Sequence, residues 1–174
     1  METYAEIEEA MRGYGCRVRV GAWLVGGINA RIGRGRLEVT QGFMSAPEPL
    51  QRVILAHEAG HVREHHGWVC WGAAAVIGGL GAGVVVACPA WLQPLAACGG
   101  MAGAVAALSA VMRWQEIRAD SWAARRCDGY AERQAALPRG SLERGWVERL
   151  ISTHPPAGAR GLRARRQSRT HRGW

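Results

Sequence analysis

The sequence predicts an α+β fold that is mainly α-helical, with a small N-terminal antiparallel β-sheet or hairpin and a hairpin of two transmembrane helices. Three patterns support this prediction. Residues 67–112 contain no charged side chain, and this length suffices for two helical crossings of a hydrocarbon core about 30 Å thick. Two short runs before residue 41 alternate at the two-residue period of a strand. Over residues 50–61, apolar side chains recur at helical spacing.

The chain has 174 residues, of which 48% are hydrophobic, so it can bury one core and lacks the composition of a disordered protein. Residues 1–66 carry eight Arg and eight acidic side chains, so the formal net charge of +8 lies after the uncharged stretch. We expect one domain over residues 1–174, interrupted by transmembrane helices at 68–88 and 90–112. An Arg-rich flexible tail follows over residues 161–174. No aromatic residues interleave with its charges, so no nucleic acid partner is expected.

Localisation is predicted from cysteine usage and from charge. The five cysteines form no C-x-x-C pair, which argues against a disulfide framework and for a reducing compartment. The acidic N-terminus has no apolar segment typical of a signal peptide. Arg63 and Arg113 flank the uncharged stretch, and positive charge favours the cytoplasmic side. We therefore expect an integral protein of a bacterial-type inner or plasma membrane, with both termini cytoplasmic.

Short elements are expected at the N-terminus. Residues 3–11 have the pattern of a short amphipathic helix, which Gly13 and Gly15 end. Residues 17–20 alternate like a half-buried strand, and a second extended run lies near residues 37–40. The Gly-rich segment between these runs is interpreted as turns, which gives the antiparallel sheet or hairpin.

Longer helices are expected after residue 44. Ser45 can cap a helix that reaches about His66, with Pro47 in its first turn and Glu48 completing a capping box. Pro89 separates the two transmembrane helices. Two small-residue motifs, Gly79-x-x-x-Gly83 and Gly99-x-x-x-Gly103, either pack these helices closely or reflect only the abundance of glycine. Charged helices are expected from Arg113 to about Cys127 and from about Ser141 to before Thr153.

Residues 57–61 read His-Glu-Ala-Gly-His and match the pattern H-E-x-x-H. On a helix, imidazoles four residues apart project together and can bind one Zn²⁺. Glu58 lies beside them and can take a proton from a zinc-bound water. Both histidines lie on the apolar stripe of their helix, so the metal would be buried against the core. The alternative interpretation is a pair of hydrogen-bonded core histidines without a metal.

A catalytic zinc also needs a third protein ligand. Gly67 stands where a metzincin would have its third histidine, which excludes that class. His65 and His66 adjoin the expected membrane boundary and are interpreted as interfacial. Glu116 and Asp120 are the better candidates because they lie four apart on one helix face. Glu116 would bind zinc and Asp120 would hydrogen-bond a ligand imidazole, although a solvated face with paired charges has the same spacing.

Several motifs in one order then resemble a known family. LAHEAGH, an apolar hairpin, E-x-x-x-D and STHPP resemble the HtpX and CAAX-prenyl-endopeptidase family of gluzincin membrane metallopeptidases. Asn29-Ala30 resembles the N-A-F strand motif of that family, and residues 39–42 resemble its v-t-x-G-L segment. Arg31 departs from the usual aromatic residue, and the short stretch between Asp120 and His154 indicates a minimal member. The resemblance implies a gluzincin-like zinc-peptidase core with the transmembrane hairpin inserted between the zinc-binding helices.

The resemblance also implies roles for individual residues. His57, His61 and Glu116 would bind one Zn²⁺ per chain, Glu58 would be the general base, and Asp120 would support a ligand or donate a proton.

Four further residues are matched outside the zinc-binding helices. His154 would steady the oxyanion of the tetrahedral intermediate. Asn29 and Ala30 would lie on the strand edge that binds the peptide substrate, and Arg160 matches an arginine that often follows the T-H-P motif.

The predicted function is therefore that of an integral membrane zinc-dependent metalloendopeptidase with a cytoplasmic active site. Its substrates would be peptide segments of membrane or membrane-associated proteins, in quality control or processing. One alternative is a non-enzymatic membrane hairpin with a structural zinc site and a basic tail that binds lipid or nucleic acid. Another is a soluble minimal gluzincin whose Gly/Ala-rich helices are buried in protein. Glu58 favours the enzyme, because a structural zinc site needs no base.

Overall fold

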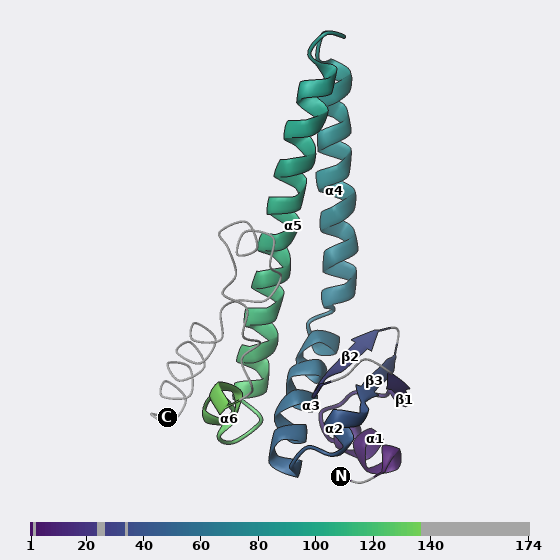
Figure 1. Ribbon diagram of the computed structural model, residues 1–174, viewed down its shortest axis with the longest axis vertical. Helices are drawn as coiled ribbons and strands as arrows, with labels where there is room; N and C mark the ends of the chain where they lie inside the picture. The colour runs from purple at the N-terminus through teal and green to yellow at the C-terminus, as the bar shows by residue number, and fades with distance from the viewer. Residues whose placement is uncertain (2, 24–26, 34, 137–174) are drawn as a thin grey trace.

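The computed structural model describes residues 1–136 except residues 2, 24–26 and 34. A long hairpin of two helices, α4 (His66–Ala87) and α5 (Gln93–Ala124), extends from a globular end (Figure 1). Both termini of the described part lie in this globular end. The mainly helical fold class with a small sheet is confirmed. The helix predicted from Ser141, the tail over residues 161–174, His154 and Arg160 all lie outside the described residues.

The sheet has three strands, β1 (Arg19–Trp23), β2 (Ala30–Gly33) and β3 (Arg36–Thr40), in the order β1-β3-β2. β2 and β3 form an antiparallel hairpin, whose turn contains Gly35 at a φ of 74°. β1 runs parallel to β3, so the prediction that the sheet is antiparallel throughout is wrong. An alternating pattern shows which side chains are buried, but it does not show in which direction the neighbouring strand runs.

The core lies between the sheet and two helices, α1 (Tyr4–Gly13) and α3 (Glu48–Arg63). The predicted N-terminal helix is confirmed as α1, which begins with a capping box between Thr3 and Glu6. Its buried face meets apolar residues of β3, of α3 and of the short helix α2 (Gln41–Met44). The fully buried core side chains include Ile7, Met11, Leu37, Phe43 and Leu55. Each such side chain contributes about 1.5–3 kcal/mol through removal of apolar surface from water.

The start of α3 differs from the prediction. α3 begins at Glu48 after Pro47, and no side chain caps it. Ser45 instead ends α2, where its hydroxyl donates to the carbonyl of Gln41. Glu48 pairs with Arg52 one turn later, so the predicted capping box is wrong. α2 is too short to show helical periodicity, and its C-cap is Ser45, the residue expected to cap α3.

The two predicted apolar helices are present as α4 and α5, and both are long and apolar enough to cross a membrane. Within the described residues, none of the most apolar part of α4 and 6% of that of α5 is buried. α5 continues without a break through Arg113 to Ala124, so the separate charged helix expected there is the second half of α5. A further short helix, α6 (Tyr130–Ala136), was not predicted.

The four glycines of the two small-residue motifs do not face the neighbouring helix. A Cβ atom added at Gly79, Gly83, Gly99 or Gly103 would meet no atom within 4 Å, and all four residues are exposed. The interpretation that these motifs pack α4 against α5 is therefore wrong. Their spacing follows from the abundance of glycine, which was the alternative.

Candidate metal centre

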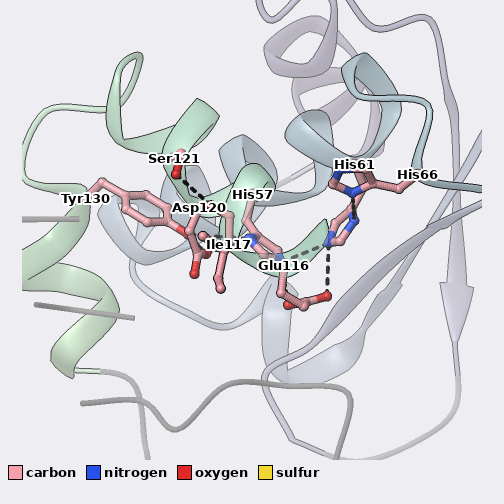
Figure 2. Close-up of polar contacts among 8 residues, drawn as sticks. All are labelled: His57, His61, His66, Glu116, Ile117, Asp120, Ser121 and Tyr130. Carbon is pink, nitrogen blue, oxygen red and sulfur yellow. Dashed lines mark hydrogen bonds and ion pairs between the residues drawn. The ribbon is translucent and has the colours of Figure 1, made fainter. Parts of the chain in front are cut away.

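Three metal-ligating side chains meet between α3 and α5. The Nε2 atoms of His57 and His61 are 3.1 Å apart, which is the pairing expected for residues one helical turn apart. The carboxylate of Glu116 approaches from α5, 3.4 Å from His57 Nε2 and 3.3 Å from His61 Nε2. All three donor atoms lie within 4.8 Å of one another. Figure 2 shows the three side chains converging.

A close approach of two helices allows this convergence. A Cβ atom on Gly60 would lie 2.9 Å from both the Cα and the carbonyl oxygen of Ala119. Gly60 has no side chain and Ala119 has a small one, so the backbones of α3 and α5 can touch there. Glu116 lies about one turn before Ala119 on α5, and the contact therefore brings its carboxylate level with the two imidazoles.

Asp120 and Tyr130 support His57 from behind. The Oδ1 atom of Asp120 lies 2.9 Å from His57 Nδ1, which leaves Nε2 facing His61 and Glu116. Tyr130, at the start of α6, donates its hydroxyl hydrogen to the same Asp120 oxygen at 2.6 Å (Figure 2). Asp120 is 5% exposed and Tyr130 2%. The sequence names Asp120 as the residue that would hydrogen-bond a ligand imidazole, and the structure places its carboxylate against His57. Tyr130 is not predicted, because no motif or periodicity marks it.

Burial and charge shift the pKa values of His57 and Glu58. Burial lowers the pKa of His57, but hydrogen bonds to Asp120 and Glu116 outweigh it and raise this pKa to about 9. Without a metal, His57 is therefore protonated near neutral pH, and a metal ion that binds there would displace this proton. Burial raises the pKa of Glu58, which the charges of His57 and His61 oppose. The backbone of Ile32 in β2 lies close enough to Glu58 to oppose this rise in its pKa as well.

His66 was interpreted as interfacial, and this is wrong. His66 is 4% exposed, and its ring packs against that of His61, with 2.7 Å between the two Nδ1 atoms. His65 is exposed and has a left-handed backbone at a φ of 52°. α3 therefore ends at Arg63 rather than at about His66, and the turn at His65 directs His66 back toward the metal-ligating side chains.

A cleft of about 1080 Å³ adjoins the cluster. Asn29, Ala30 and Arg31 line it from β2 and the residue before it, and Trp68 and Trp71 line it from the first turns of α4. β2 is an edge strand, and no other described strand pairs with its far side.

The donor set itself fits a catalytic zinc ion. Two imidazoles and one carboxylate are the ligands found at zinc sites that keep a position open for water or substrate. The orientation of His57 by a carboxylate is also typical of such sites. His57, His61 and Glu116 are partly or fully buried, and they face a cleft rather than a closed core.

One known protein family matches most of the chain. The family model described as peptidase family M48 matches residues 27–167, which is more than half of the chain. The match includes the two helices that carry the candidate metal ligands, the apolar hairpin and the strand at the edge of the cleft. No curated protein and no solved structure matches the chain.

Proposed function

The chain belongs to peptidase family M48, and from this premise we propose that it is a zinc-dependent metalloendopeptidase held in a membrane by α4 and α5. Membership confirms the family predicted from the sequence and implies hydrolysis of peptide bonds. The observation that carries the zinc proposal is the meeting of His57, His61 and Glu116 beside Glu58 at one cleft. His57, His61 and Glu116 would hold the ion. A bound Zn²⁺ supplies Lewis-acid polarisation of a carbonyl and acidification of water.

Glu58 is the general base of the proposed reaction. It takes a proton from the water molecule that attacks the scissile carbonyl carbon, and it delivers a proton to the amine that leaves. Burial raises the pKa of Glu58, which favours a group that both accepts and donates a proton near neutral pH. Asp120 orients His57 through its Nδ1 atom.

The substrate peptide is proposed to lie along β2 as an added strand. Asn29 and Ala30 line the cleft. Backbone groups at an unpaired sheet edge can bind an extended peptide through hydrogen bonds. Glu58 and Ile32 line the same cleft, so the proposed base lies beside this edge. We also propose that His154 steadies the oxyanion and that Arg160 contacts the substrate.

Membrane insertion is proposed from the two exposed apolar helices. The helices leave the globular end together, and the cleft opens beside Trp68 and Trp71 at the base of α4. These tryptophans are 80% and 73% exposed, as is common where a helix enters the headgroup region. With the active site in the cytoplasm, the substrates would be segments of membrane or membrane-associated proteins, during quality control or processing.

Substitution of Glu58 tests the chemistry. Glu58→Gln keeps the size of the side chain and removes the base, so hydrolysis of casein by detergent-purified protein should fall to background while zinc stays bound. Glu9→Gln, an exposed substitution on α1, is the matched control and should keep full activity. Full activity in Glu58→Gln would contradict the proposed mechanism.

A further inference from the structure

We propose that His66 is a positioning residue that fixes the ring of His61 for metal binding. This inference rests on the proposed zinc site, and it concerns a residue outside the H-E-x-x-H and E-x-x-x-D motifs. Two observations prompt it. His66 contacts a ligand imidazole directly, and its other ring nitrogen, Nε2, is buried without a hydrogen-bond partner among the described residues.

The two nitrogens of His61 face different partners. Nε2 points to the metal-ligating cluster, 3.1 Å from His57 Nε2 and 3.3 Å from Glu116 Oε1. Nδ1 points away from the cluster and lies 2.7 Å from His66 Nδ1. The two rings cross at 78° with centroids 4.8 Å apart, so they meet through their nitrogens rather than by stacking (Figure 2).

Metal binding fixes the protons of this pair. A neutral imidazole that gives the lone pair of Nε2 to a metal carries its proton on Nδ1. His61 Nδ1–H must then donate, and His66 Nδ1 must accept. The single proton of neutral His66 is therefore on Nε2, which is the buried atom without a partner. A buried N–H without a hydrogen-bond partner is costly. The chain therefore keeps His66 despite this cost, and the Nδ1 atom of His66 supports His61.

The backbone holds His66 in this position. Five residues along a continuous helix would place His66 about 140° around the axis from His61, out of contact. The left-handed residue His65 breaks the helix and turns His66 back. The side-chain amide of Gln115 then donates to the carbonyl oxygen of His66 at 2.9 Å. Gln115 directly precedes Glu116, so α5 carries both the third proposed ligand and the side chain that holds the backbone of His66.

The two proposed ligand histidines therefore have chemically different supports. His57 is held by the carboxylate of Asp120, whereas His61 is held by a neutral imidazole. Support of this kind usually changes metal affinity by about 10–100-fold. We expect His66→Phe, which keeps a ring and removes the acceptor, to weaken zinc binding within that range. His66→Asn places an amide oxygen as acceptor and should remain within about threefold of the wild type.

Competition of each protein with a zinc chelator measures these affinities. His65→Asn is the matched control, because it changes the adjacent exposed histidine to a residue that tolerates a left-handed backbone, and its zinc affinity should be unchanged. Equal affinity of His66→Phe and wild type would overturn the inference, as would equal weakening by Phe and Asn. A wild-type protein that binds no zinc would overturn the proposed function itself, so the two failures are distinguishable.

Nitrogen-15 NMR of histidine-labelled, zinc-loaded wild type keeps the test independent of how the variants fold. The expected result is a proton on Nδ1 of His61 and on Nε2 of His66. A proton on Nδ1 of His66 would overturn the inference, because that atom could then not accept from His61.

Discussion

At the scale of single residues, Tyr130 supports the candidate site. Its hydroxyl donates a hydrogen bond to Asp120, and Asp120 in turn contacts His57. We predict that Tyr130→Phe lowers the free energy of unfolding of the metal-free protein by about 1–3 kcal/mol, because a buried carboxylate loses a donor. Zinc affinity should fall by about tenfold, because His57 is held less firmly. Thermal unfolding and chelator competition measure these effects.

The control for this variant is Tyr4→Phe, which removes an exposed hydroxyl on α1 and should change neither quantity. If Tyr130→Phe leaves both the unfolding free energy and the zinc affinity as in wild type, the hydrogen bond to Asp120 does not support His57.

Residue spacing could predict the central cluster but not all of its surroundings. His57, His61, Glu116 and Asp120 are recognisable because helical periodicity places residues four apart on one face. His66 reaches His61 only through the left-handed turn at His65, and no sequence pattern predicts that turn. Tyr130 depends on the placement of α6 against α5, a tertiary contact that a single sequence does not specify.

The contact of α3 with α5 determines the site at the scale of elements. Gly60→Ala would add a Cβ atom 2.9 Å from the backbone of Ala119, so the two helices would have to separate. We predict a loss of about 1–3 kcal/mol in the free energy of unfolding, as for other overpacked sites. Zinc affinity should fall as well, because Glu116 moves away from the histidines. Denaturant unfolding and chelator competition measure the two effects.

Gly13→Ala is the matched glycine substitution, since a Cβ atom at Gly13, in the last turn of α1, would meet no atom within 4 Å. It should leave zinc affinity unchanged. Zinc affinity of Gly60→Ala equal to wild type would show that the close approach of the helices is not needed for Glu116 to bind.

At this scale, helices were predicted more accurately than the sheet. The apolar helices and α1 follow from composition and periodicity, which are local properties of the chain. β1 pairs in parallel with β3, a strand that is not its neighbour in sequence, and the alternation of apolar residues does not specify such a partner or its direction. The predicted cap of α3 is wrong because the Ser45 hydroxyl donates to the carbonyl of Gln41 at the end of α2.

The path of the chain through a membrane is a property of the whole molecule. Arg63 and Arg113 lie near opposite ends of the uncharged stretch, so both should remain in the cytoplasm. We predict that a reporter enzyme inserted near residue 90 is extracytoplasmic and that one fused after residue 174 is cytoplasmic. The geometry supports this, because α3 and the second half of α5 meet at the same end of the hairpin. Reporters on the same side of the membrane would contradict a transmembrane hairpin.

The zinc content of purified protein tests the central proposal, that α3 and α5 together build one catalytic zinc site. We predict one zinc per chain in the wild type and in Glu58→Gln, because Glu58 acts in the reaction without holding the metal. Glu116→Gln should lose most of its zinc, because a neutral amide is a poor ligand for this ion. Wild-type protein without zinc, or full zinc occupancy in Glu116→Gln, would contradict a zinc site built by both helices.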